Sequence, residues 1–185
     1  MNKFSLSLVI LLLLFFGAGS VFAQQRTWKT YSPDNGAWSI LAPGAMTPDA
    51  EAQAAESNKG SYSYNDFSGF FAVIYRDSPK RWVPWKADHT AYFRRVRRDV
   101  VKASKGKLLK EEKFTNGALV GREIQIKIQV GTMTNIEGLT KPRYRVQRIR
   151  MFFVGERFYM LLAVVPENEI DSPAINQYFD SFVVK

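Results

Sequence analysis

The sequence predicts an α+β protein built on a twisted antiparallel β-sheet flanked by helices. Short turns separate consecutive strand-like segments in the second half of the chain, at residues 107–115, 118–130, 144–154 and 157–165. A long amphipathic segment precedes these strands and a short one follows them. Because the strands are grouped rather than alternating one by one with helices, the pattern favours an antiparallel sheet with helices packed on it.

The first 23 residues have the pattern of a cleaved secretory signal peptide. Lys3 supplies a positive start, residues 6–16 form an apolar run, and Val21-Phe22-Ala23 matches the small-x-small motif that signal peptidase cleaves. The run is shorter than the about 20 residues of a membrane span, and an uncleaved N-terminal anchor is the alternative. We therefore expect residues 24–185 to form one exported domain, periplasmic or secreted, without a transmembrane span.

The composition limits both the partners and the chemistry. The chain of 185 residues carries 26 Lys and Arg against 17 Asp and Glu, a formal net charge of +9, and has no cysteine. The lack of cysteine excludes thiol catalysis, thiolate metal sites and disulfides. For a basic protein outside the cytoplasm the candidate polyanions are phospholipid head groups, anionic glycans and acidic proteins, so we expect no nucleic-acid partner. A charge that serves only solubility is the alternative.

The first half of the chain contains four predicted strands, at residues 26–31, 37–41, 61–67 and 70–77. Asn35-Gly36 supplies the positive φ of a tight turn between the first two. The fourth is apolar almost throughout, so we expect it inside the sheet. Residues 44–59 are predicted to be irregular or extended, because their alanines favour a helix that no large apolar side chain would hold by packing.

The strands of the second half have clear turns and faces. Asn116-Gly117 and Gly155-Glu156 have the composition of two-residue hairpin turns, whereas residues 131–142 predict a long loop. The pattern of residues 118–130 predicts a strand with one buried face and one solvent-exposed face. Polar side chains alternate there with three isoleucines, Ile124, Ile126 and Ile128.

The next strand is rich in arginine. Its buried face is predicted to carry the apolar residues Ile149, Met151 and Phe153. Because successive side chains alternate between the two faces, Arg148 and Arg150 are predicted to point outward. Arg143 and Arg145 have the opposite parity to that pair, so either the strand starts after them or a bulge intervenes.

A short helix is predicted near the C-terminus. Ser172 is its cap and Pro173 its first residue. Four aromatic or aliphatic side chains then form one stripe at helical spacing, at Ile175, Tyr178, Phe179 and Phe182.

The long helix contains the most conspicuous charge pattern, in the stretch AYFRRVRRDVVKASKGK, and ends near Gly106. One arc of its helical wheel is the predicted core face, with Trp85, His89, Tyr92, Phe93, Val96, Val100 and Ala103. The opposite arc carries the candidate anion-binding residues Arg94, Arg95, Arg98, Lys102 and Lys105. A solvated face explains where these cations lie but not why they share one sign, since like charges at i, i+4 repel. Both interpretations, solvated face and anion-binding face, stay open.

No constellation of catalytic or metal-binding residues is present, so we expect no enzyme, no cofactor and no metal. His89 is the single histidine, which excludes a histidine-based zinc or copper site, and we expect it at the rim of the core. Glu111 and Glu112 are adjacent on a strand and point to opposite faces, so they cannot act as an acid–base pair. Asp34-Asn35-Gly36 lacks the further ligands of a calcium loop. Trp82 covers a sheet edge or is free to stack on a sugar or lie at a membrane interface.

Several segments together resemble the PsbP-like exported domain, including its DcrB-type bacterial relatives. They are YSPDNGAWSILAPGAM, FFAVIYRDSP, VGREIQIKI, RIRMFFVGERFYMLLAVVP and INQYFDSFVV, and they extend over nearly all of residues 24–185. The resemblance implies a twisted antiparallel sheet sandwiched between helices, and it carries no catalytic residue.

Two functions follow as hypotheses. The first is a non-enzymatic accessory or interaction domain of the bacterial envelope, with an unknown envelope protein as its partner. The second is a binding module for an anionic surface or ligand, either phospholipid or anionic glycan, through the basic face of the long helix.

Overall fold

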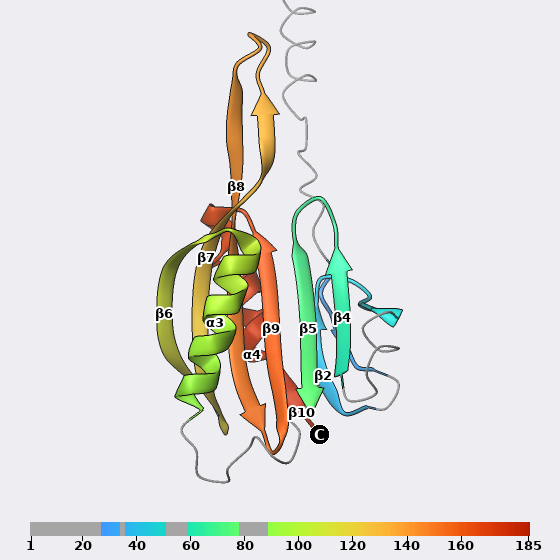
Figure 1. Cartoon of the computed structure of the whole chain (residues 1–185). Coiled ribbons are helices and arrows are strands. Elements are labelled where there is room, and N and C mark those ends of the chain that lie inside the picture. The colour runs from blue at the N-terminus through green and yellow to red at the C-terminus, as the bar shows by residue number, and fades with distance from the viewer. Residues whose placement is uncertain (1–26, 34–35, 51–58, 78–88) are drawn as a thin grey trace, which may run out of the picture.

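The computed structural model describes residues 27–33, 36–50, 59–77 and 89–185 (Figure 1). The predicted signal peptide, the turn residue Asn35, and both Trp82 and Trp85 lie outside the described residues. No helix within the described ranges is long and apolar enough to cross a membrane.

Two antiparallel sheets form the body of the molecule. The larger has seven strands in the order β3-β4-β5-β9-β8-β7-β6. Their bounds are β3 Thr47–Pro48, β4 Lys59–Asn65, β5 Phe70–Asp77, β6 Lys107–Asn116, β7 Leu119–Thr134, β8 Thr140–Val154 and β9 Arg157–Val165. The smaller sheet has the order β1-β2-β10, with β1 Lys29–Tyr31, β2 Trp38–Ala42 and β10 Val183–Val184. The helices are α3 Thr90–Ser104, the 3₁₀ turn η1 Glu167–Glu169, and α4 Pro173–Asp180.

The apolar segment β5 is an interior strand, as expected, between β4 and β9. Its consecutive residues Phe71, Ala72 and Val73 are all fully buried. Since successive side chains point to opposite faces of a strand, this run requires both faces of the sheet to be covered.

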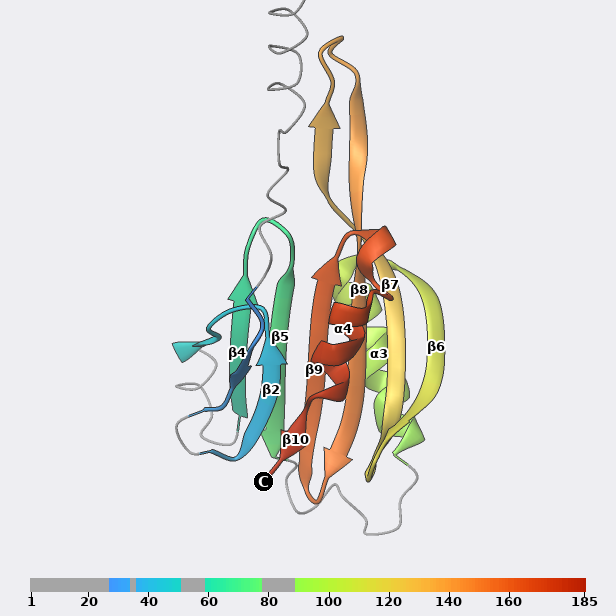
Figure 2. The same cartoon turned by 180° about the vertical axis from the view of Figure 1, so that it is seen from behind.

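The two coverings are different. Figure 1 shows α3 across one face, and Figure 2 shows α4 and the small sheet on the other. On the α3 face, Phe93 packs in one core cluster with Ile124, Ile126 and Met151. The opposite core is larger and more aromatic, with Trp38, Phe71, Phe152, Tyr178, Phe179 and Phe182 among its members. The predicted antiparallel sheet with helices on it is thus confirmed in that coarser form, while the second face is shared between a helix and a small sheet.

The final helix follows its prediction closely. The Ser172 hydroxyl accepts the amide hydrogen of Ile175, Pro173 is the first residue of α4, and the predicted apolar stripe is buried. After α4 the chain forms a short strand, β10, which pairs antiparallel with β2. The sequence pattern did not predict this strand. Tyr178 also donates its hydroxyl to the carbonyl of Ala72 at 2.8 Å, so α4 is bonded directly to the sheet beneath it.

Two predictions about the connections need correction. The turn between β6 and β7 has Gly117 and Ala118 at its centre, one residue later than expected, because Asn116 pairs with Leu119. Residues 131–142 are not a long loop: β7 and β8 continue as a paired hairpin as far as Thr134 and Thr140. The turn at Gly155-Glu156 is as predicted, with φ of 58° at Gly155.

Candidate functional site

The basic helix α3 ends in a sharp reversal that places it on the sheet. Lys105 takes the left-handed conformation, with φ of 50°, and its amide bonds to the carbonyl of Lys102. Gly106 follows, where a Cβ would lie 2.4 Å from a methyl group of Ile126 and 2.9 Å from the carbonyl of Lys127. Only glycine fits there, and its close approach brings the C-terminal end of α3 against β7.

The inner face of α3 is largely the one predicted. Phe93 is buried, while Tyr92, Val96 and Val100 are partly buried against the sheet. Ala103 is exposed, so its assignment to the core face is wrong, and Val101 packs against the core cluster near this end of α3 instead.

His89 lies at the rim of the core, as expected. Its ring stacks on Phe153 with centroids 4.2 Å apart and meets Phe93 edge to face at 6.2 Å. These ring contacts give His89 a packing role beneath the start of α3.

The outer face of α3 carries a group that we call the α3 cations: Arg94, Arg95, Arg98, Lys102 and Lys105. All of them are exposed. Asp99 is the acidic neighbour, at 3.8 Å from Arg95 and 3.6 Å from Arg98, and the side chains of these two arginines remain 68% and 72% exposed. Within the described ranges no ion pair involves Arg94, Lys102 or Lys105. The positive charge of this face is therefore only partly compensated.

Arg97 differs from its neighbours. It forms an ion pair with Glu111 of β6, and both side chains are mostly covered. Glu112 instead bonds to Lys110 at 2.8 Å. The two adjacent glutamates therefore diverge as predicted, and Glu111 serves to tie α3 to the sheet.

The sheet face under α4 contains a group of charged side chains that the sequence analysis missed. The prediction that Arg148 and Arg150 point into solvent is wrong, because they are 6% and 8% exposed. They do point away from the α3 core, as their parity requires, but α4 covers that side of the sheet as well (Figure 2).

Glu123 of β7 joins the two arginines. Its carboxylate accepts from Nε of Arg148 at 2.7 Å and from Nε of Arg150 at 2.5 Å. The other guanidinium nitrogens reach α4 and its approach: Arg150 donates to Asp180 at 2.5 Å, and Arg148 to the side chain of Asn176 at 2.7 Å. We call Glu123, Arg148, Arg150 and Asp180 the buried arginine cluster.

An aromatic ring completes the cluster. Phe179 lies over both guanidinium groups, at 5.0 Å from Arg148 and 5.2 Å from Arg150, within the range of a cation–π contact. Both carboxylate oxygens of Glu123 are engaged, and the charges of Glu123, Arg148 and Arg150 are buried and paired, whereas the Asp180 side chain is 56% exposed. The arrangement holds α4 on the sheet and offers no accessible acid or base.

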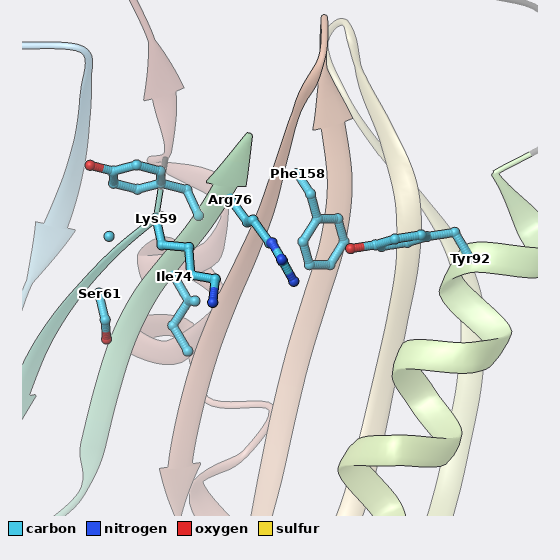
Figure 3. A pocket seen from close by; sticks show the side chains of 8 residues that line it. Lys59, Ser61, Ile74, Arg76, Tyr92 and Phe158 are labelled. Atoms are coloured by element: carbon cyan, nitrogen blue, oxygen red, sulfur yellow. The ribbon is translucent and has the colours of Figure 1, made fainter. Parts of the chain in front are cut away.

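A hollow of about 230 Å³ opens between β4, β5 and the start of α3 (Figure 3). Its exposed lining surface is largely apolar, with Ile74 and Phe158 among its residues and Tyr92 at one side, but the cationic side chains of Lys59 and Arg76 also line it. Burial raises the pKa of Tyr92, and the charges of Arg76 and Arg95 only partly oppose this, so the phenol is protonated at neutral pH. Such a hollow can receive an apolar group but supplies no general base.

Among the described residues, no three His, Asp or Glu side chains gather where they could hold a metal ion.

Comparison with known proteins gives a fold. No protein-family model matches the sequence, and no curated protein matches it. Among solved structures, cyanobacterial PsbP (CyanoP) from Synechocystis sp. PCC 6803 is similar with a TM-score of 0.57 and 15% identity, over 90% of this chain and 96% of that one. The chain has the PsbP-like fold.

A second solved structure is similar over nearly the same length. The Ran-binding protein Mog1p of Saccharomyces cerevisiae matches 86% of this chain and 96% of its own, with a TM-score of 0.50 and 13% identity. Identities this low speak for the fold alone, so the predicted PsbP-like resemblance is confirmed at the level of architecture.

Proposed function

We propose that residues 24–185 form an exported, non-catalytic interaction domain that acts by offering its surface to a partner in the cell envelope. The observation that carries this proposal is the contrast between engaged and accessible charges. In the buried arginine cluster, the Glu123 carboxylate is bonded to both Arg148 and Arg150. The α3 cations instead face solvent, and Asp99 is the acidic neighbour among them. The PsbP-like fold agrees with this proposal by analogy, since the similar Mog1p is described as a binding protein.

Export is the first part that can be tested. The signal-like pattern predicts that the mature chain begins at Gln24 and is recovered without detergent. Intact-mass measurement on secreted or periplasmic material checks this. Recovery of the chain only in the membrane fraction with residues 1–23 still attached would contradict it.

Partner binding is tested by capture from the envelope fraction of the native host. The exported protein, tagged at its C-terminus, should recover one discrete protein in near-stoichiometric amount, and that protein should recover this chain in the reciprocal experiment. A chain that recovers no discrete partner, even after chemical cross-linking of intact cells, is not an interaction domain of the envelope.

A second candidate function is favoured specifically by the α3 cations. In this view α3 binds an anionic surface or ligand, either phospholipid or anionic glycan. Residues 94, 98 and 102 repeat at i, i+4 and i+8, so the cations repel each other when α3 is unbound, and an anion would relieve that repulsion. Contacts between exposed charges are screened within roughly 8–10 Å at physiological ionic strength, so this binding should weaken steeply with salt.

The test replaces Arg94, Arg98 and Lys102 with Gln. A matched control replaces three exposed lysines elsewhere, Lys29, Lys113 and Lys185, and so removes the same charge. Co-sedimentation with anionic and neutral vesicles, and retention on anionic glycan, are compared at low and moderate salt. The α3 variant should lose binding and the control keep it. Equal behaviour of both variants would mean that the α3 cations are only a solvated face.

A further inference from the structure

The hairpin of β7 and β8 extends well beyond the rest of the sheet. Pairing of β8 with β9 stops at Val146, and pairing of β7 with β6 stops at Lys127, but β7 and β8 stay paired as far as Thr134 and Thr140. Figures 1 and 2 show the resulting two-stranded arm projecting from one end of the molecule. An isolated two-stranded ribbon is marginally stable in water, so an arm of this length calls for an explanation.

The end of this arm carries three exposed apolar side chains, beside the acidic residue Glu137. Met133 is 62% exposed, Leu139 57% exposed, and Ile136 at the apex has no protein cover at all. These side chains gather at one projecting tip, unlike the single exposed apolar residues that are normal on a protein surface.

The apex is an ordered turn. The side-chain oxygen of Asn135 accepts the amide hydrogens of Glu137 at 3.1 Å and of Leu139 at 2.8 Å. The amide of Asn135 donates in turn to the carbonyl of Leu139 at 3.0 Å. These hydrogen bonds define a turn around Asn135 with Ile136 at its apex.

Both edges of the arm are poorly suited to pairing with another strand. Pro142 has no amide hydrogen to donate, and the pairing of β7 shifts at a bulge around Val130, between Gln129 and Gly131. Proline and bulges on free edges are devices that prevent edge-to-edge addition. Recognition by this arm must therefore run through its side chains.

Cations lie directly behind the apolar tip. Lys141 and Arg143 are exposed, while Arg145 donates to the carbonyl of Phe67 at 2.8 Å and braces the base of the arm. At a rise of about 3.4 Å per residue, Lys141 and Arg143 lie about 7 and 14 Å behind Leu139. The distance to Lys141 matches a bilayer interface, where apolar side chains enter about 5–10 Å below the level of the head groups.

We propose that the tip of the β7–β8 arm docks on an anionic lipid bilayer. Ile136 and Leu139 enter the interface, while Lys141 and Arg143 contact the anionic head groups. Met133 pairs with Lys141 and lies at that same level. The positive charge behind the tip favours a bilayer over an apolar protein groove, because a bilayer offers apolar and anionic layers at the matching separation. This site is separate from α3 and does not rest on the proposed function.

The absence of cysteine from the chain permits a site-specific test. An environment-sensitive fluorophore is attached to Ile136→Cys, and the same label at Val120→Cys, an exposed apolar position elsewhere on β7, is the matched control. With vesicles of phosphatidylcholine and phosphatidylglycerol, the label at residue 136 should shift to shorter wavelength and the label at residue 120 should not. The label reports on its own position, so contact of another part of the chain with the vesicle does not imitate the result.

Two further variants complete the test. Ile136→Ser with Leu139→Ser should lower vesicle affinity about tenfold or more, since burying one aliphatic side chain corresponds to at least that factor. Lys141→Gln with Arg143→Gln should lower it several-fold on anionic vesicles, whereas Lys29→Gln with Lys113→Gln should not. Unshifted fluorescence at residue 136 with every vesicle overturns the proposal. A shift produced only by lipid-free envelope protein would assign the tip to a protein groove and overturn it equally.

Discussion

The buried arginine cluster and the α3 cations contain the same residue types in opposite circumstances. Arg148 and Arg150 bond to Glu123 at 2.7 and 2.5 Å, and α4 covers them. Arg95 and Arg98 lie no closer than 3.6 Å to a shared Asp99 and stay mostly in solvent. The difference teaches that arginine content alone says little about function here: what matters is whether a second layer of structure covers the charge and supplies its partners.

The largest expected effect comes from Glu123→Gln, which leaves two buried guanidinium groups without their shared carboxylate. Removing one partner from a buried ion pair costs about 3–5 kcal/mol, because an uncompensated charge stays behind. Chemical denaturation should therefore show a loss in that range, out of a typical total of about 5–15 kcal/mol. A loss below about 0.5 kcal/mol, typical of a surface position, would show that the cluster does not hold α4.

Phe179→Ala should be nearly as damaging, because the ring is buried and lies over both arginines. Truncation of a buried phenylalanine costs about 3–5 kcal/mol when the site cannot collapse. Phe179→Leu is the matched control, because it keeps most of the apolar volume but removes the aromatic ring. The loss of unfolding free energy that remains in this variant measures the contact of the ring with the guanidinium groups. Denaturation midpoints of both variants decide the matter, and an unchanged Phe179→Ala midpoint would mean that α4 does not dock as described.

Asp66 sharpens the comparison, because it is a surface charge with a structural role. Its carboxylate accepts the Ser68 hydroxyl at 2.5 Å, the amide hydrogens of Ser68 and Gly69, each at 2.9 Å, and the Tyr64 hydroxyl at 3.1 Å. Burial alone would raise the pKa of Asp66, but these hydrogen bonds together outweigh it and lower that pKa below 3.8. The ionised form therefore stabilises the fold above the unfolded-state pKa, and that contribution is lost as pH falls through the folded-state pKa.

Asp66→Asn should accordingly destabilise the protein by about 1 kcal/mol at pH 7, a modest value because solvent screens this loop. The deficit should shrink as the pH falls below 3.8. Denaturation of both proteins at a series of pH values measures it. A deficit that stays constant down to the acid limit would show that the charge of Asp66 is irrelevant.

The smallest effect on stability is expected for the combined change of Arg94, Arg98 and Lys102 to Gln. These side chains are exposed and repel each other, each neighbouring pair by roughly 0.2–0.5 kcal/mol. The variant should unfold at the same denaturant concentration as the wild type, or slightly higher. A clear loss of stability would place the α3 cations among the groups that maintain the fold, and any change in binding would then be indirect.

The sequence predicted most elements because their signals are local. Alternation placed Ile124 and Ile126 on one buried face, and the cap at Ser172 with the stripe after it located α4. Two predictions made together already contained the missing information. Two amphipathic helices each need an apolar surface to cover. If they cover different faces of one sheet, the polar residues on the face away from Ile124 and Ile149 lie under the second helix.

The buried arginine cluster was missed because its partners are distant in sequence. Arg148 and Glu123 are 25 residues apart, and Arg150 and Asp180 are 30 apart. Glu123 lies opposite Arg150 in the register of β7 and β8, which only the pairing of the strands reveals. Reading the wet-face pattern of β7 as solvent exposure was the specific error.

The β7–β8 arm was missed for a different reason. Its threonines, glycines and proline have the composition of a loop, and neither face of the arm is buried to impose alternation. Arg143 and Arg145 have the parity of the α3 face, as the sequence indicated, because β8 simply continues past the region that α3 covers. The alternative that the strand starts after these arginines is wrong, because β8 begins at Thr140, and the register shift lies on β7, between Gln129 and Gly131.

One matched pair of substitutions tests most directly whether the two groups of arginines are used differently. Arg148→Gln and Arg98→Gln make the same chemical change, one under α4 and one on the open face of α3, and their unfolding free energies are measured by chemical denaturation under identical conditions. We expect Arg148→Gln to lose about 3–5 kcal/mol and Arg98→Gln to stay within about 0.5 kcal/mol of the wild type. Equal losses, or a larger loss for Arg98→Gln, would contradict the division between arginines that hold the fold and arginines that face a partner.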